Sequence, residues 1–439
     1  MTAREAALSV LKRCRREGAW SGAAVDSMIR KNSLDRRDAS LVSALCLGVL
    51  QNRSYFDFLI DSFCTTKSAK IEPGLRDILH LGLCQLLLLD RIPPRAAVNE
   101  TVLLCRSAGM QRASGLVNAV LRRVSENRDR LPEVPGKGRA SYLSTRYSQP
   151  LWLAEQLTEQ EGYAFTEAFF SFNNEASGLT VQINTQKTDV SAFLRLLEER
   201  QISYTSASFP SGSVDIRGGS ISELPGYEEG LFYVQDRSAR IAAELTGSEP
   251  GMRLLDVCAA PGGKSFACAI RMKNEGEIIS CDIHEKKLSL IRSGAERLGL
   301  SIIKPMARDA RLPMEEWNGR FDIVIADVPC SGFGVMAGKP EIRFKTREEI
   351  AGLPAIQLDI LRCAASFVKP GGTLLYSTCT VLREENEGVV TAFLAENRKY
   401  SVVPFSLPGG DCPEGMHTFW PHIDGGDGFF AAKLQRTEQ

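Results

Sequence analysis

Two cysteines stand where a thiol can carry out covalent chemistry. Cys330 ends the segment 327–330 (Asp-Val-Pro-Cys), and Cys379 ends the segment 377–379 (Ser-Thr-Cys). Each follows a short apolar run, 321–326 or 372–376, that is typical of a buried strand. In an open parallel sheet, ligands and reacting groups collect at the carboxyl ends of the strands. Two strand ends that each deliver a thiol indicate covalent chemistry on an electrophilic carbon.

A glycine-rich turn lies upstream of both thiols. Residues 256–265 (Asp-Val-Cys-Ala-Ala-Pro-Gly-Gly-Lys-Ser) join a predicted strand to a predicted helix. Glycines let a ligand approach the backbone, and the N-terminus of the helix offers free N–H groups. The next strand ends in Asp282, where doubly wound folds use an acid to hold a ribose diol. A third strand leads to Asp309, whose carboxylate we expect to accept a hydrogen bond from an adenine amino group.

Three kinds of nucleotide site compete for this turn. A dinucleotide site requires G-x-G-x-x-G, which is absent here. A P-loop requires G-x-x-x-x-G-K-[ST]; residues 263–265 match its end and 321–327 could form its Walker B strand, but Cys258 replaces the first glycine. A methyl-donor site fits the three acids and the short turn, and it is the favoured interpretation. A turn without a ligand is the remaining alternative.

The elements that must position these groups alternate between strand and helix from about residue 236, which predicts a parallel sheet. A smaller α/β unit precedes it, and residues 3–130 have helical apolar spacing throughout. The predicted strands of the sheet are 253–258, 277–283, 301–307, 321–327, 371–377 and a late strand at 429–434. The predicted domains are a helical bundle (1–130), a linker (131–149), a small α/β subdomain (150–235) and a catalytic domain (236–439).

Length and cysteine usage limit the protein class. A chain of 439 residues is expected to form two or three domains. Its 12 cysteines include no C-x-x-C pair, which argues against a disulfide framework or a zinc ribbon and favours a reducing cytosol. Cys412, His417 and His422 match no common zinc spacing, so no metal is expected. We expect neither a signal peptide nor a membrane span, and therefore a cytoplasmic protein.

The charge is divided between the two parts of the chain. Residues 1–150 carry 24 Lys and Arg against 14 Asp and Glu, whereas residues 151–439 carry 29 against 39. The basic part has clusters at 12–16, 36–37 and 122–130. This pattern predicts a basic module that binds a nucleic acid, joined to an acidic module with another task.

Together these motifs resemble those of the RNA cytosine-5 methyltransferases that use S-adenosylmethionine. Residues 258–264 are similar to the cofactor loop of that family, and 327–332 and 377–379 to its two cysteine motifs. Residues 233–236 and 427–430 are also similar, and the order of the motifs is kept. The helical part resembles the NusB-like RNA-binding module that one bacterial subfamily, acting on 16S ribosomal RNA, carries at its N-terminus.

Two positions depart from that family. Ala337 and Gly338 precede Lys339-Pro340, where the family often has two basic residues. Arg237 follows Gln235-Asp236, where the family often has a small or acidic residue.

The resemblance implies a fold and a reaction. The fold is an all-α NusB-like bundle, then a small α/β RNA-binding subdomain, then a Rossmann-like class I methyltransferase domain. The reaction is methylation of a cytosine C5 in 16S rRNA. Cys379 is the implied nucleophile that adds to C6, and Cys330 the group that assists removal of the C5 proton and release of the enzyme. Asp327 holds the base near N3 and touches the reactive end of the cofactor, and Lys264 donates a hydrogen bond in the base pocket.

The implied cofactor is S-adenosylmethionine. The residues expected to bind it are Cys258, Ala259, Ala260, Pro261, Gly262, Gly263, Lys264, Asp282, Asp309 and Asp327. The implied partner is 16S rRNA, free or in an assembling small subunit, with no membrane and with the protein acting as a monomer.

Three alternatives stay open from the sequence. One is the same chemistry on tRNA or on another rRNA site. Another is a P-loop ATPase with an RNA-binding helical domain. The last is a non-catalytic RNA-binding protein that kept a cofactor fold, against which the combination of Cys379, Cys330 and Asp327 argues.

Overall fold

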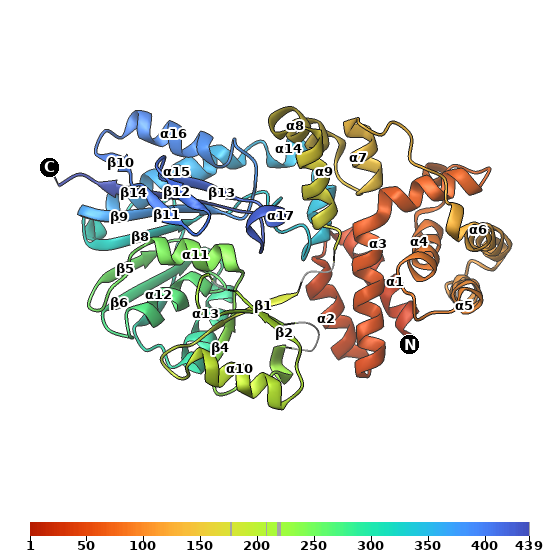
Figure 1. Cartoon of the computed structure of the whole chain (residues 1–439), viewed down its shortest axis with the longest axis horizontal. Helices are drawn as coiled ribbons and strands as arrows, with labels where there is room; N and C mark the ends of the chain where they lie inside the picture. Colours follow the sequence, from red (N-terminus) through yellow and green to blue (C-terminus); the bar gives the residue numbers. More distant parts are fainter. Residues whose placement is uncertain (176–177, 208, 217–220, 439) are drawn as a thin grey trace. The chain divides into compact units, whose positions relative to one another are not determined.

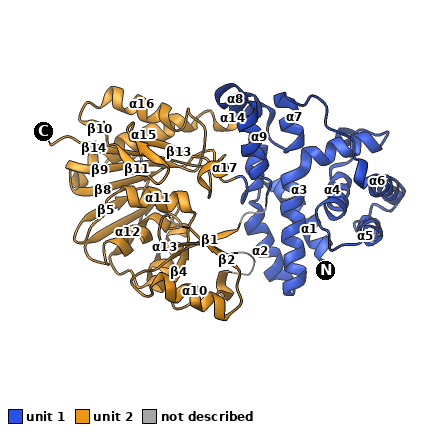
Figure 2. Ribbon diagram, viewed as in Figure 1, with its two compact units in different colours: residues 1–176, 336–347 blue, residues 177–335, 348–439 orange. Residues whose placement is uncertain are grey.

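The computed structural model describes residues 1–175, 178–207, 209–216 and 221–438, and the chain forms two compact units. Unit 1 comprises residues 1–176 and 336–347, and unit 2 comprises residues 177–335 and 348–439 (Figure 2). The boundaries of these two units do not coincide with the boundaries of the predicted domains. The helices between residues 140 and 172 belong with the N-terminal bundle, and so does the short segment 336–347, which the sequence had assigned to the C-terminal domain.

Unit 1 is built from helices, and those within residues 1–126 pack around one apolar core, as the apolar spacing predicted. Local signals set where the helices begin: Thr2 and Glu5 form a capping box on the first helix, and Asp35 accepts from the backbone N–H of Asp38 at the start of the third. Leu45, Leu79 and Val120 from three different helices lie buried in the shared core. The helices are α1 (Ala3–Glu17), α2 (Ser21–Asn32), α3 (Arg36–Phe63), α4 (Pro73–Leu87), α5 (Pro94–Ser107), α6 (Ser114–Glu126), α7 (Ala140–Arg146), α8 (Leu151–Glu161) and α9 (Tyr163–Phe172).

The segment 336–347 completes unit 1 with a buried arginine. Arg343 donates to the carbonyl oxygens of Gln51 (2.9 Å), Tyr147 (3.1 Å) and Asn173 (2.8 Å), and to Oδ1 of Asn174 (2.5 Å). All four of these acceptors are neutral oxygens, and burial lowers the pKa of the Arg343 guanidinium to about 9. Carbonyl dipoles from three parts of the bundle therefore replace the water around this cation.

Unit 2 contains two sheets. The smaller one has the order β2-β3-β1-β4, and all its pairs are antiparallel. Helix α10 (Val190–Glu199) covers it by burying Phe193 and Leu197 against Val181 and Val214. Its strands are β1 (Leu179–Ile183), β2 (Tyr204–Ser206), β3 (Ser213–Ile216) and β4 (Phe232–Val234).

The larger sheet has the order β10-β14-β9-β8-β5-β6-β7, with β13 paired to β14. The five strands from β5 to β9 are parallel to one another, as predicted, while β14 runs antiparallel to β9 and makes the sheet mixed. The strands are β5 (Arg253–Asp256), β6 (Glu277–Asp282), β7 (Ile303–Ala307), β8 (Phe321–Asp327), β9 (Val368–Thr378), β10 (Tyr400–Val402), β13 (Met416–Phe419) and β14 (Phe429–Arg436); β11 (Phe405–Leu407) and β12 (Gly410–Cys412) form a separate pair.

Helices cover both faces of this sheet (Figure 1). Neighbouring strand residues point to opposite faces: Leu254 belongs to one apolar core and Leu255 to the other, and likewise Leu375 and Leu374. Strands buried on both faces read as continuous apolar runs, which is what the sequence shows. The first core is closed by α11 (Arg237–Leu245), α12 (Gly263–Arg271) and α13 (Glu285–Leu298), the second by α15 (Leu353–Phe367) and α16 (Glu387–Glu396); α14 (Arg347–Ile350) and α17 (Pro421–Asp424) are short.

One stretch, 347–367, is long and apolar enough to cross a membrane by length and composition. Within it, Ile360, Leu361 and Ala364 of α15 are buried in the second core of the sheet. That packing is the arrangement of a core helix.

Candidate active site

The two thiols meet because their strands are neighbours. Strands β8 and β9 are parallel, and their register places Asp327 opposite Ser377. Cys330 and Cys379 follow these positions within three residues, and their Sγ atoms lie 3.2 Å apart. Both side chains are half-buried. Two groups that are 49 residues apart in the sequence thus share one site at the carboxyl end of the sheet.

Backbone contacts hold the segment after Cys330 against the segment after Cys379. The N–H of Gly334 donates to the carbonyl oxygen of Cys379 at 3.0 Å, and the N–H of Gly428 donates to the carbonyl oxygen of Gly334 at 2.8 Å. A Cβ atom on Gly334 would lie 1.8 Å from the carbonyl oxygen of Gly428. Only glycine allows this approach, so the turn before β14 is part of the site.

The electrostatic setting of Cys330 favours its neutral form. The hydrogen bond with Cys379 raises the pKa of the Cys330 thiol well above its usual value, and burial raises it further. Either sulfur can be the donor in this contact. When Cys330 keeps its proton and donates to Cys379 Sγ, the hydrogen bond stabilises negative charge on the second sulfur. The pair therefore has one member suited to carry a proton and one suited to carry charge.

Asp327 and Lys264 form an ion pair beside the thiols. Lys264 Nζ lies 2.7 Å from Asp327 Oδ2, and Ser377 Oγ donates to Asp327 Oδ1 at 2.8 Å. Lys264 is buried, with Nζ 4.7 Å from the ring centroid of Phe429, whereas a third of the Asp327 side chain is exposed. From the sequence, each of these two residues was expected to make its own contact to the base. The structure joins them, so Lys264 also orients the carboxylate.

The cofactor loop expected at 258–264 connects β5 to the first turn of α12. Its backbone is tied to the next strand by a hydrogen bond from Ala259 N–H to the carbonyl oxygen of Cys281 (2.7 Å). Gly262 has φ +114°, and a Cβ there would lie 2.5 Å from the ring of Phe266. Gly263, with Lys264 after it, then begins α12, so Ala260, Pro261 and Gly262 form the turn that exposes the N-terminus of the helix.

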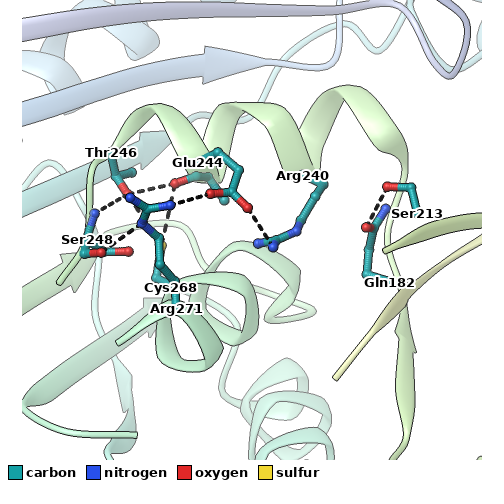
Figure 3. A network of polar contacts seen from close by, with 9 residues as sticks. Gln182, Ser213, Arg240, Glu244, Thr246, Ser248, Cys268 and Arg271 are labelled. Atoms are coloured by element: carbon teal, nitrogen blue, oxygen red, sulfur yellow. Dashed lines mark hydrogen bonds and ion pairs between the residues drawn. The ribbon is translucent and has the colours of Figure 1, made fainter. Parts of the chain in front are cut away.

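A polar network between α11, the residues that follow it and the end of α12 holds α12 in place (Figure 3). Near the end of α12, Arg271 forms an ion pair with Glu244 of α11 at 2.8 Å and donates to the carbonyl oxygen of Ser248 at 2.8 Å. Glu244 also pairs with Arg240 on its own helix at 2.6 Å. The helix that begins with the cofactor loop is therefore fixed to its neighbour at its other end.

The three acids at the strand ends differ in their surroundings. Asp256 is buried beneath the loop, accepts from Ser265 Oγ at 2.9 Å, and has its pKa raised to about 7 by burial. Asp282 accepts from the N–H of His284 through Oδ1 at 2.8 Å, and its Oδ2 accepts no hydrogen bond from the described residues. Asp309 accepts three hydrogen bonds from Arg311, which lower its pKa to about 2.

Asp256, Asp282 and Asp327 lie close to Cys258. Burial raises the pKa of the Cys258 thiol well above its usual value, and the charges of Asp256, Asp327 and Asp282 add to the effect. The residues fit the expected cofactor. Asp282 Oδ2 is available to a hydroxyl donor, and α12 begins directly after the loop that follows β5, so the N-terminus of this helix lies at the carboxyl end of that strand.

Two buried polar residues behind the thiols were missed from the sequence. Glu385 and Asn386 have 1% and 0% of their surface exposed. Their only signal in the sequence is a polar run, Glu-Glu-Asn-Glu at 384–387, shortly after Cys379.

Comparison with known proteins gives the same order of parts along the chain. The family described as NusB matches residues 1–126, the "Methyltr_RsmF/B-like, ferredoxin-like domain" matches 149–217, and "16S rRNA methyltransferase RsmB/F" matches 244–435. The probable ribosomal RNA small subunit methyltransferase B of Bacillus subtilis (strain 168) is 33% identical over 442 residues, which cover 99% of this chain and 98% of that protein. Ribosomal RNA small subunit methyltransferase B of Klebsiella pneumoniae subsp. pneumoniae is 32% identical, with 91% and 90% covered.

Solved structures show the same fold. The crystal structure of PH0851 superposes with a TM-score of 0.82 at 24% identity and covers 99% of both chains. NSun6 from Pyrococcus horikoshii, crystallised with SFG, has a TM-score of 0.57 at 19% identity and covers 69% of this chain and 99% of its own. The full-length similarity to known methyltransferases removes the P-loop ATPase alternative. With a NusB domain, a ferredoxin-like subdomain and a methyltransferase domain in this order, the chain belongs to the RsmB/F family of ribosomal RNA small subunit methyltransferases.

Proposed function

We propose that the protein transfers a methyl group from S-adenosylmethionine to C5 of a cytosine in 16S rRNA, through a transient bond between Cys379 Sγ and C6. The observation that carries this proposal is the 3.2 Å distance between two thiols at the ends of neighbouring parallel strands, beside Asp327. The relatives are named as methyltransferases of the small-subunit ribosomal RNA, which supports the substrate.

The reaction needs a nucleophile because cytosine C5 is itself a weak one. Cys379, as a thiolate, attacks C6, and the electron pair of the C5–C6 double bond moves so that C5 becomes nucleophilic. S-adenosylmethionine, when bound, supplies a methyl group on a positively charged sulfur. Cys330 then assists removal of the C5 proton, the C5–C6 double bond re-forms, and the Cys379–C6 bond breaks. The raised pKa keeps Cys330 protonated at neutral pH before the adduct forms, which leaves the negative charge of the nucleophile to Cys379.

Asp327 and Lys264 act on the base. The carboxylate accepts a hydrogen bond from the protonated edge near N3, which stabilises the adduct as charge develops. The Lys264 ammonium, at 2.7 Å from that carboxylate, keeps it oriented. The thiolate must approach C6 from above or below the ring, and stacked neighbours cover both faces of the ring. The nucleotide must therefore be unstacked or flipped to reach this site.

S-adenosylmethionine would be held at the strand ends around Cys258. Asp282 accepts from the ribose hydroxyls, Asp309 accepts from the adenine amino group, and the 258–264 loop cradles the rest. The excess of positive charge in residues 1–150 supports RNA binding by unit 1, whose Lys and Arg side chains contact phosphates. We expect a cytoplasmic monomer that acts on free 16S rRNA or on an assembling small subunit.

The test is methyl transfer from labelled S-adenosylmethionine to protein-free small-subunit rRNA and to bulk tRNA, followed by nucleoside analysis. We expect 5-methylcytidine in the rRNA. 5-Methylcytidine in tRNA alone would keep the chemistry and overturn the substrate, and a label at any other atom would overturn the reaction.

The roles of the thiols are tested separately. Cys379→Ala should abolish transfer, whereas Cys330→Ala should accumulate a covalent protein–RNA complex that survives denaturing electrophoresis. Cys412→Ala is a matched control, since this half-buried cysteine lies on β12, which pairs with β11 in a separate two-stranded sheet. Normal turnover by Cys379→Ala would contradict the assignment of the nucleophile.

A further inference from the structure

Asn386 holds the backbone on both sides of Cys379. Its Oδ1 accepts from Thr378 Oγ1 at 2.6 Å, and its Nδ2 donates to the carbonyl oxygen of Thr380 at 3.1 Å. Asn386 is fully buried, and so are both threonines. The residue before Cys379 and the residue after it are thus fixed to one amide group.

Glu385 holds the backbone on both sides of Cys330. Its Oε2 accepts from the backbone N–H of Ser331 at 2.9 Å and from Gln357 Nε2 at 2.8 Å. The same Gln357 amide donates to the carbonyl oxygen of Pro329 at 3.0 Å. The residues before and after Cys330 are therefore both tied to the Glu385 carboxylate, one directly and one through Gln357.

The two sets of contacts belong to one rigid piece of chain. Glu385 and Asn386 are consecutive, so their Cα atoms are about 3.8 Å apart. Their backbone N–H groups donate to Leu382 O (3.1 Å) and Arg383 O (3.2 Å), and Tyr376 OH donates to the carbonyl oxygen of Glu385 at 2.5 Å. This piece is anchored both to its own turn and to β9.

We propose that Glu385 and Asn386 are positioning residues that set the distance and direction between the two thiols. The inference rests on the proposed function, because it gives these residues a part in the reaction of Cys379 and Cys330. A direct hydrogen bond between Ser331 and Thr380, with 2.8 Å between their hydroxyl oxygens, closes the arrangement by joining the two thiol loops.

The chemistry explains why such control is needed. Cys379 must reach C6 while Cys330 must reach the proton on C5, and C5 and C6 are neighbouring atoms of one ring. A misplacement of about 1 Å can cost about 100-fold in rate. Residues that only filled space behind the loops would not need a carboxylate and an amide, which are costly to bury unless paired.

Glu385 adds a second effect through its charge. It is among the groups that raise the pKa of Cys330, after the hydrogen bond to Cys379, burial and the Cys379 charge. Glu385→Gln keeps the shape and an acceptor oxygen but removes this charge. This variant therefore separates the effect of the charge from the effect of the hydrogen bonds. The pH at which the rate changes should shift, while the distance between the two thiols should remain the same.

The first experiment measures kcat and KM for methyl transfer in Asn386→Ala, Asn386→Asp, Glu385→Ala and Glu385→Gln. We expect the alanine variants to lose about 10- to 100-fold in kcat, with KM for S-adenosylmethionine unchanged. Asn386→Asp keeps the acceptor for Thr378 but loses the donor to Thr380, and should fall between Asn386→Ala and the native enzyme. Asn397→Ala and Glu396→Gln, at the far end of α16, are the matched controls and should keep native kcat.

The second experiment reads the thiol geometry without any methyl transfer. Diamide oxidises a pair of adjacent thiols to a disulfide: each thiol gives up its hydrogen, a bond forms between the sulfurs, and the N=N bond of diamide is reduced to a hydrazine. In the native protein the 3.2 Å contact should make Cys330–Cys379 pairing fast, as followed by peptide mass analysis after alkylation of the remaining thiols. We expect pairing at least tenfold slower in the alanine variants and native-like in Glu385→Gln.

The outcomes separate the two proposals. Lower kcat with unchanged KM and slower pairing supports the positioning role. Native kcat and native pairing in every variant overturns it, and so does a loss of kcat without any change in pairing among the alanine variants. If the native enzyme methylates no RNA while pairing still slows in the variants, the proposed function fails and the positioning role stands. If an alanine variant does not fold, as judged by loss of its thermal transition, Asn386→Asp carries the test.

Discussion

Gly334→Ala is the sharpest steric test of the site. The new Cβ would lie 1.8 Å from the carbonyl oxygen of Gly428 and 2.9 Å from that of Cys379. Real Cβ atoms essentially never come closer than 3.0 Å to such atoms, so the gap to Gly428 must widen from 1.8 Å to at least 3.0 Å. The chain segments on either side are backbone, which cannot rotate away as a side chain can.

The loss of stability follows from the hydrogen bonds that this shift breaks. The hydrogen bonds Gly334 N–H to Cys379 O (3.0 Å) and Gly428 N–H to Gly334 O (2.8 Å) cannot both survive. Losing one or two backbone hydrogen bonds, at about 1 kcal/mol each, and overpacking, at about 1–3 kcal/mol, together destabilise unit 2 by about 3 kcal/mol. For a unit of this size that corresponds to a fall of about 6–12 °C in its thermal midpoint.

The assay is thermal unfolding with and without S-adenosylhomocysteine, whose stabilising effect identifies the transition of unit 2. Gly352→Ala is the control, because Gly352 has φ −84° and a Cβ added there would meet no atom within 4 Å, so the midpoint should change little. Methyl transfer should fall in Gly334→Ala as well, since Cys379 moves with its carbonyl group. An unchanged midpoint together with unchanged kcat would refute the reasoning.

Three further predictions concern other parts of the chain. Asp282→Ala should weaken binding of S-adenosylhomocysteine about 10- to 100-fold by calorimetry without changing RNA affinity, whereas Asp359→Ala should not; an unchanged Kd would remove Asp282 from the ribose site. Because burial raises the pKa of Asp256 to about 7, its contribution to stability is present at low pH and is lost as the pH rises through that value. The stability of Asp256→Asn relative to the native protein should therefore increase from about pH 5 to about pH 8 in urea unfolding, and a constant difference would contradict the raised pKa. Arg343→Met leaves four buried acceptors without their donor and should lower the midpoint of unit 1 and expose segment 336–347 to proteolysis, whereas exposed Arg112→Met should do neither.

The strands and the thiol motifs were accessible from the sequence because their signals are local. Apolar runs bounded by turns marked β5 to β9, and functional residues in doubly wound folds follow the carboxyl ends of such strands. The closeness of Cys330 and Cys379 depends in addition on β8 and β9 being neighbours in register, which pairing within the folded sheet decides.

Other features depend on partners far along the chain. Glu385 and Asn386 lie in a polar run without apolar periodicity. Asn386 pairs with the nearby Thr378 and Thr380, but Glu385 accepts from the backbone N–H of Ser331, 54 residues away, which no local pattern reveals. The ion pair of Lys264 with Asp327 likewise joins residues of α12 and β8. Sequence spacing therefore predicted the two thiols and Asp327 as candidate site residues, while the buried residues that contact their loops emerged only from the packing.

The segment 336–347 has a consequence for synthesis of the protein on the ribosome. Residues 1–176 emerge first, but the carbonyl groups that surround Arg343 stay without their donor until residue 343 has been translated. At about 5–20 residues per second, the intervening stretch of the chain takes roughly 10–30 s to make. During that time residues 1–176 lack the donor that Arg343 supplies to their carbonyl groups. The N-terminal unit thus reaches its final form only after the Asp-Val-Pro-Cys motif has already left the peptidyl transferase centre, which makes its maturation dependent on synthesis of the catalytic unit.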